Sequence, residues 1–217
     1  MSQNMRDRAK QLFPSVALTL LSIVQAIALE TLWGQIQDAH YLYETSIYAL
    51  IGWLQVSATL FGLGLIWVIY ASNVMRFAWV PTMNDLIYPF LVGLVEFWMV
   101  ASIGPDTAPS WHVAMAIIVG LVTFITQVSM RAARFDPANK EFFVDRTPAQ
   151  WHDFLPQIGV VLGLLAIALA LWLLPMVASL QLAGALAVLI FLVWQFVSSA
   201  RFWKRSMQND QKIDDQA

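Results

Sequence analysis

The sequence contains no cysteine and few charged residues, and these two shortages exclude several classes of protein. Of its 217 residues, 12 % are charged and 59 % are hydrophobic, whereas a soluble globular domain carries about 25 % charged residues. A chain without cysteine forms no disulfide framework, thiolate metal site or thiol redox centre. The net charge of −2 leaves no basic surface for a nucleic acid. We therefore expect a membrane protein with no nucleic-acid partner.

Motifs for catalysis and cofactor binding are missing as well. The three histidines fall in predicted loops or at the ends of apolar stretches, so an intramembrane haem with two histidine ligands is disfavoured. There is no H-E-x-x-H zinc motif, no G-x-S-x-G nucleophile elbow and no glycine-rich phosphate loop. Some polar residues gather around the first predicted outer loop without the spacing of a known metal site: Glu30, Asp38, His40 and Glu44. We expect neither an enzyme nor a bound cofactor or metal.

Long apolar runs are what the sequence has in abundance. A membrane-spanning helix needs about 20 mainly apolar residues, and six stretches qualify: 14 to 34, 46 to 72, 86 to 104, 111 to 130, 155 to 175 and 180 to 202. No low-complexity linker separates them, so the sequence predicts one all-α, six-span transmembrane domain over residues 1–217. The letters "AIA" at 26 to 28 resemble a signal-peptide cleavage site, but the apolar run continues to Trp33 and is long enough to span, so we expect the first helix to be retained.

The basic residues predict the orientation of these spans. Cytoplasmic loops retain Lys and Arg, and all twelve basic residues lie before the first span, between spans 2 and 3, between spans 4 and 5, or at and after the end of span 6. Both termini are then cytoplasmic in a plasma (inner) membrane, with cytoplasmic segments 1–13, 131–154 and 203–217. In the last of the basic clusters, Arg201, Lys204 and Arg205 are expected to contact anionic phospholipid head groups. Within 131–154, "TPAQ" at 147 to 150 predicts a short helix that begins at Thr147.

The stretch "FLVGLVEFWMV" at 90 to 100 places a single carboxylate, Glu96, near the middle of the membrane. An ionised acid there costs on the order of 3 kcal/mol, and protonating a glutamic acid at pH 7 costs roughly 3.7 kcal/mol. No Lys, Arg or His lies within a span except at its ends, so this chain offers no intramembrane ion pair. Glu96 is then protonated and hydrogen-bonded, bound to a cation, in a water-filled pocket, or paired with a basic residue of another chain.

Amide side chains near the same depth are candidate neighbours of Glu96. Helical spacing gives polar stripes to spans 1, 2 and 4, which can point at one interior. Spans 1 to 4 are thus expected to form a four-helix polar-lined bundle, with spans 5 and 6 as a C-terminal helical hairpin beside it. Span 5 has no polar stripe but contains Gly159 and Gly163, so it is either a lipid-facing shell or an oligomer seam. The candidate pore or ion-binding residues are Glu96, Gln25, Gln55, Gln127 and Glu30.

Two functions of different classes fit these residues. The first is transport or permeation of protons, cations or a small solute by a homo-oligomer, with Glu96 as the titrating or cation-binding group. The second is a non-catalytic membrane subunit or scaffold, in which Glu96 meets a basic residue of a partner subunit or is only buried structure. Purification in mild detergent separates them, because the second requires a stoichiometric foreign subunit.

Overall fold

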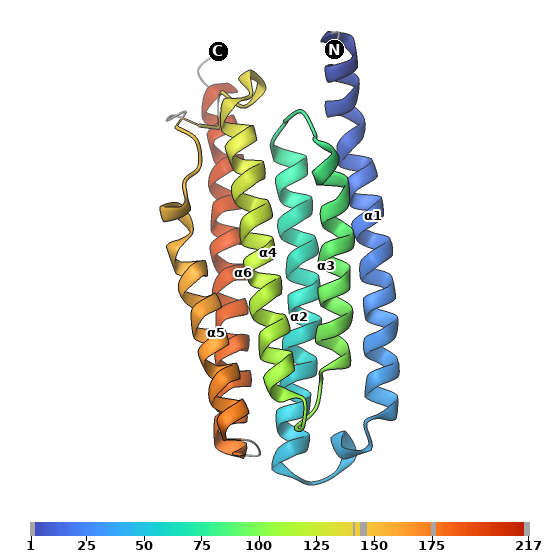
Figure 1. Cartoon of the computed structure of the whole chain (residues 1–217). Coiled ribbons are helices and arrows are strands. Elements are labelled where there is room, and N and C mark those ends of the chain that lie inside the picture. Colours follow the sequence, from blue (N-terminus) through green and yellow to red (C-terminus); the bar gives the residue numbers. More distant parts are fainter. Residues whose placement is uncertain (1–2, 141, 144–146, 175–176, 215–217) are drawn as a thin grey trace.

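The computed structural model describes the backbone of residues 3–140, 142–143, 147–174 and 177–214, and the side chains of 4–140, 142–143, 147–174 and 177–204. Helices account for nearly all of these ranges, which hold no strand (Figure 1). The long helices are α1 (Gln3–Asp38), α2 (Ile47–Arg76), α3 (Met83–Ala101), α4 (Ala108–Phe135), α5 (Leu155–Leu173) and α6 (Ala178–Asp214). Three short 3₁₀ helices lie in the connections: η1 (His40–Tyr43), η2 (Pro137–Asn139) and η3 (Trp151–Phe154).

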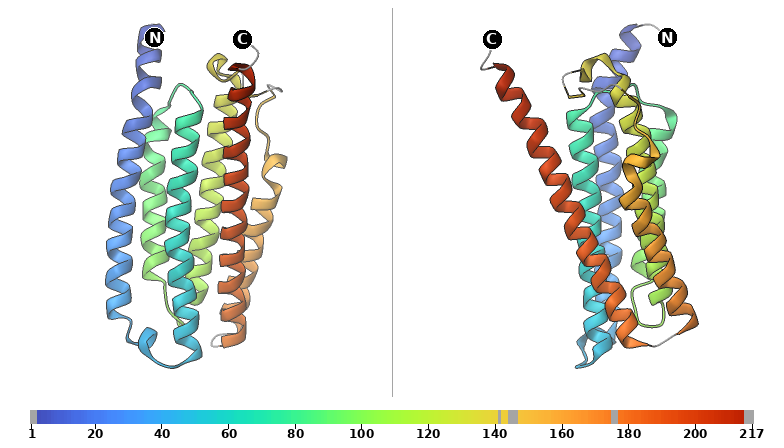
Figure 2. Two further views of the ribbon diagram at one scale, coloured as in Figure 1. Left: turned by 180° about the vertical axis from the view of Figure 1, so that it is seen from behind. Right: turned by 90° about the vertical axis from the view of Figure 1, so that its left-hand side faces the viewer.

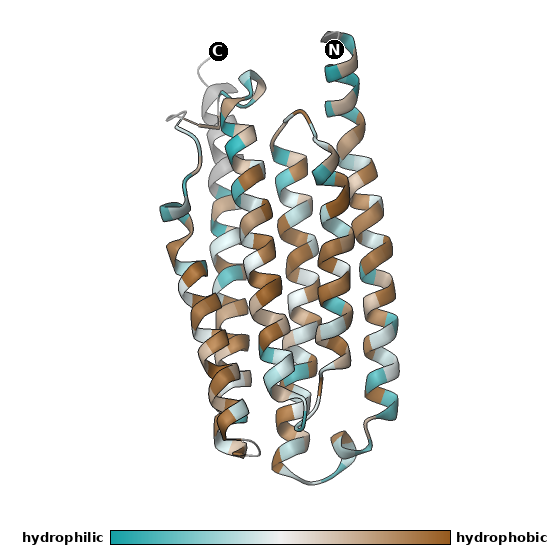
Figure 3. Ribbon diagram, viewed as in Figure 1, coloured by the Kyte–Doolittle hydropathy of each residue, from teal (hydrophilic) through white to brown (hydrophobic). Residues whose placement is uncertain are grey.

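The six expected spans are confirmed as helices that are long and apolar enough to cross a membrane. Large apolar side chains cover the outside of the bundle, and Leu94, Trp172 and Ile190 are each more than 60 % exposed. The apolar colour follows the middle of the helices, and the polar colour is more frequent toward their ends (Figure 3). A soluble monomer does not expose apolar surface of this extent. The chain is therefore a multi-pass membrane protein.

Both ends of the chain lie at the same end of the bundle, which we call the N/C end (Figure 1). The α2–α3 and α4–α5 connections also lie there, whereas η1 and the α3–α4 connection lie at the opposite, far end. The described basic side chains, from Arg6 and Arg76 to Lys204, accordingly sit at or near the N/C end.

The helices pack mainly in neighbouring pairs: α1 on α3, α3 on α4, α4 on α5 and α2 on α6. Contacts between α5 and α6 are fewer, because the two helices meet near the far end and diverge toward the N/C end (Figure 2). The last two helices thus form an open hairpin whose arms each pack on a different helix of the bundle.

The helix expected from Thr147 begins later in the structure. Residues 147–150 are not helical, and η3 starts at Trp151 after a capping box between Gln150 and Asp153. Two side chains of α4 hold the preceding backbone: Arg134 donates to the carbonyl of Thr147 over 3.2 Å, and Gln127 donates to that of Ala149 over 3.1 Å. These two hydrogen bonds hold residues 147–150 against α4 in a non-helical conformation. The prediction that a helix begins at Thr147 was therefore wrong by about one turn.

Candidate functional site

Glu96 of α3 lies inside the bundle against Gln25 of α1. Glu96 is fully buried, Gln25 is 6 % exposed, and Nε2 of Gln25 donates to Oε1 of Glu96 over 2.9 Å. The second carboxyl oxygen, Oε2, is buried and has no hydrogen-bond partner among the described residues. The expectation that an amide from another span contacts Glu96 is therefore confirmed for Gln25.

Gly93 determines how closely α1 and α3 approach at this level. A Cβ atom at Gly93 would collide with Cγ1 of Val24, the residue that precedes Gln25. Gly93 precedes Glu96 by about 4.5 Å along the helix axis and lies on the same buried face. The glycine thus allows the contact that brings Gln25 to the carboxyl group. Gly93 was not among the residues predicted from the sequence, although small residues mark close helix contacts in membranes.

A small cavity of about 30 Å³ lies one helical turn from the pair, toward the N/C end. Its wall includes Leu21 and Val92, each one turn before Gln25 or Glu96, and Tyr70 and Asn73 of α2. This volume is enough for about two water molecules. On the other side of Glu96, Val100 and Ile103 are 0 % and 3 % exposed, so the bundle is packed toward the far end.

The other proposed site residues do not join this pair. The Gln55 side chain is at the far end, where its Oε1 accepts from the backbone N–H of Gly104 over 3.0 Å. Gly104 has a φ of 150°, which favours glycine, and Gln55 thus holds the α3–α4 connection. Gln127 contacts Ala149 near the N/C end, and Glu30 is exposed on the outside of α1. The polar stripes were expected to meet at one interior. Of the candidate residues, only Gln25 and Glu96 meet there.

The basic residues expected to meet lipid head groups lie late in α6. Arg201 and Lys204 are exposed, whereas the side chain of Arg205 lies outside the described residues. Their contact with anionic head groups remains a prediction.

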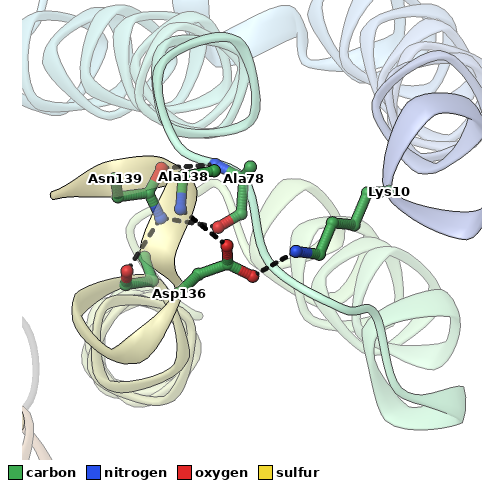
Figure 4. Close-up of polar contacts among 6 residues, drawn as sticks. Lys10, Ala78, Asp136, Ala138 and Asn139 are labelled. Carbon is green, nitrogen blue, oxygen red and sulfur yellow. Dashed lines mark hydrogen bonds and ion pairs between the residues drawn. The ribbon is translucent and has the colours of Figure 1, made fainter. Parts of the chain in front are cut away.

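A polar clamp at the N/C end joins three parts of the bundle (Figure 4). Lys10 of α1 forms an ion pair with Asp136 at 2.6 Å, and Asp136 caps η2 by accepting from the N–H of Ala138. Asn139, 2 % exposed, donates Nδ2 to the carbonyl of Ala78 over 2.6 Å and accepts from the Ala78 N–H over 2.9 Å. The clamp therefore ties α1 and the α2–α3 connection to the end of α4.

Replacing Asn139 by alanine is expected to destabilise the protein by about 1–3 kcal/mol, because buried backbone groups of Ala78 lose their partners. Thermal unfolding in detergent measures the change. Asn84→Ala is the matched control, since Asn84 is exposed in the first turn of α3 and should tolerate alanine. Equal unfolding temperatures for the two variants would contradict this role of the clamp.

Within the ranges that the structure describes, no group of three or more His, Asp or Glu side chains is placed to hold a metal ion. Comparison with protein-family models, with curated proteins and with solved structures finds no match to this chain.

Proposed function

We propose that the chain is a small membrane transport protein in which Glu96 binds the transported proton or cation. The observation that carries this proposal is the burial of Glu96 with one amide partner and a second oxygen left unbound. Most buried polar atoms have a hydrogen-bond partner, so an unpartnered carboxyl oxygen calls for an explanation. Intramembrane acids that lack a basic partner mark proton and ion pathways more often than plain packing.

The surroundings of Glu96 suggest how a proton or cation reaches it. The cavity of about 30 Å³ lies one helical turn from the pair, on the N/C side, and has room for water. Gln25 donates to Oε1, so Oε2 is the oxygen that takes up the proton or the cation. Release toward the far end requires α3 to move against its neighbours, because Val100 and Ile103 are packed there. We infer a carrier that alternates between two states rather than an open pore.

A homo-oligomer in the plasma (inner) membrane is part of this proposal, and the chain is not proposed to be an enzyme. Gly159 and Gly163 support the oligomer, because both lie exposed on α5 with no atom within 4 Å of a Cβ built on either. A pair of small residues four positions apart suits close contact with a second helix. The exposed face of α5 would then be the seam between copies.

The positive-inside rule supports a cytoplasmic N/C end. Reporters fused after residue 217 and inserted within 136–146 should both report cytoplasm, and one inserted near residue 106 should report the opposite side. This pattern is expected because the basic residues lie at one end of the bundle. A C-terminus outside the cytoplasm would contradict the proposed orientation.

A second candidate function is a non-catalytic subunit or scaffold, and the observation that favours it is Glu30. This carboxylate is exposed on the outside of α1, with no hydrogen bond or ion pair to any other described residue. A charge that faces lipid is costly, and a partner helix would cover it. Recovery from mild detergent only with a stoichiometric foreign subunit would favour this function; a homo-oligomer favours transport.

The test of the transport proposal is flux through purified protein in vesicles. An imposed inward gradient of protons, Na⁺ or K⁺ should change the signal of an enclosed dye that senses that ion, faster than in protein-free vesicles. Absence of flux for protons, Na⁺ and K⁺ in correctly folded protein would overturn the proposal.

A further inference from the structure

The divergence of α5 and α6 leaves a cavity of about 410 Å³ between α2, α4, α5 and α6. Most sites for small molecules measure about 300–1,000 Å³, so this cavity is large enough to hold one. It is separate from the pair of Gln25 and Glu96, which does not line it.

The deep part of the cavity is apolar. Its wall is built from aliphatic and methionine side chains and one glycine: Gly62, Leu65, Met99, Met115, Ile118 and Leu192. On α2 the lining runs from Gly62 to Arg76, about 21 Å of helix axis. This length exceeds half of a hydrocarbon core about 30 Å thick. The shape therefore suits an extended alkyl chain that enters from the N/C end.

The mouth of the cavity is polar and contains two arginines. Arg76 is held under aromatic rings, 4.6 Å from the centroid of Phe202 and 5.1 Å from that of Trp203. Arg134 donates through Nη1 to Thr147, and the same nitrogen is 3.8 Å from Oδ2 of Asp153. Among the described residues that line this cavity, two carry a guanidinium group, Arg76 and Arg134, and one carries a carboxylate, Asp153.

Three buried polar atoms at the mouth have no hydrogen-bond partner among the described residues: Nε of Arg134, Oε1 of Gln157 and Oε1 of Gln195. Turning a glutamine amide over exchanges the positions of its oxygen and its NH₂ group. Both glutamines are therefore able to place an N–H donor where the oxygen now lies. Ser198 and Ser199 add hydroxyl donors to the same lining. Polar groups buried without partners are rare, and several donors in one lining fit an anionic oxygen group.

We propose that this cavity binds an anionic amphiphile, with its alkyl chain in the apolar part and a phosphate head group at Arg134 and Gln195. The guanidinium group of Arg134 selects the head group, and the apolar wall of α2 and α4 selects the chain. Arginine binds phosphate through charge-assisted hydrogen bonds, and the Arg134 side chain lines the mouth. The site does not depend on the role of Glu96, and the ligand is a lipid of the inner leaflet rather than a free anion.

Binding is measured with the whole protein in phosphatidylcholine nanodiscs. The affinity is obtained from the amount of radiolabelled dodecyl phosphate that protein-containing discs retain, after the amount retained by empty discs is subtracted. Dodecanol and inorganic phosphate are the competitors, since each carries one half of the proposed ligand. Only unlabelled dodecyl phosphate is expected to compete at the concentration of the ligand.

Two pairs of variants assign the site. Arg134→Gln should weaken binding by about 10-fold or more, because a charge-assisted contact is lost, whereas Arg131→Gln, at an exposed position on the same helix, should not. Gly62→Leu should fill the apolar part and weaken binding to a similar degree. Gly64→Leu is its control, because Gly64 is exposed on α2 with nothing within 4 Å of its Cβ.

A third variant changes affinity in the opposite direction. Asp153→Asn removes the carboxylate that competes for Arg134 and should tighten binding of dodecyl phosphate. Equal competition by dodecanol would overturn the anionic head group, and equal competition by inorganic phosphate would overturn the alkyl chain. Unchanged affinity in both Arg134→Gln and Gly62→Leu would overturn the site. If one of the two variants folds poorly, unchanged affinity in the other is enough to overturn it.

Discussion

Replacing Glu96 by glutamine is expected to reduce proton- or cation-dependent flux to the level of protein-free vesicles while the protein still folds and assembles. The amide has the shape of the carboxyl group, and its oxygen still accepts from Nε2 of Gln25. It neither takes up a proton nor carries the charge that a cation requires. The measurement is the initial rate at which the signal of the enclosed ion-sensitive dye changes. Vesicles with wild-type protein are compared with vesicles that contain an equal amount of the variant.

Glu30→Gln is the matched control for this experiment. Glu30 is also a carboxylate within a predicted span, but it is exposed on α1 and does not contact Glu96. The control should retain flux and, under the subunit function, should weaken association with a partner. Loss of a partner from Glu96→Gln instead would indicate a basic residue of another chain at Glu96, because an unpaired buried charge costs about 3–5 kcal/mol. Unchanged flux in Glu96→Gln would remove this residue from the transport mechanism.

The six spans could be predicted from the sequence because length and hydropathy alone determine them. Lipid requires every backbone group in a span to be satisfied within its own helix, so an apolar run of about 20 residues has one structure available. Because a helix rises 1.5 Å per residue, relative depth could be predicted for Gln25 and Glu96. Counting residues from the ends of their spans placed Gln25 and Glu96 at one level, and they are in contact at 2.9 Å. The same count placed Gln55 near the midplane, and its side chain lies at the far end instead.

The rotation of each helix about its axis could not be predicted in this way. Spacing groups polar residues on one face, but it does not say which neighbour that face meets. Gln55 reaches the backbone of the α3–α4 connection, and Gln127 reaches the segment before η3. Both amides satisfy loop groups that fold back onto the bundle, and a count of residues within spans contains no information about loops.

The cavity between α5 and α6 could not be predicted from the sequence either. A short connection after α5 suggests a closed hairpin, yet α6 packs along α2 and leaves α5 on α4. In the sequence, Arg76 and Arg134 mark the cytoplasmic side, and Arg134 also falls on the polar face of span 4, but nothing there brings the two arginines together. Their position at one mouth depends on where two distant helices end, which becomes visible only in the fold.

Gly93→Ala is expected to have the second-largest effect, a loss of about 2–5 kcal/mol of stability. The added methyl group collides with Val24, so α1 and α3 have to separate. Separation also breaks the hydrogen bond of 2.9 Å between Gln25 and Glu96 and leaves a buried carboxyl group without its amide. Thermal unfolding in detergent measures the stability, and flux should fall with it.

Two further variants separate this effect from the general effect of alanine in a helix. Gly64→Ala, on the exposed face of α2, has open space around the new methyl group and should be neutral or more stable by up to about 1 kcal/mol. Val24→Ala combined with Gly93→Ala removes the colliding methyl groups and should recover part of the stability and of the flux. If Gly93→Ala behaved like Gly64→Ala, the close approach of α1 and α3 would not be what holds Gln25 against Glu96, and the carboxyl group would have to be positioned by α3 alone.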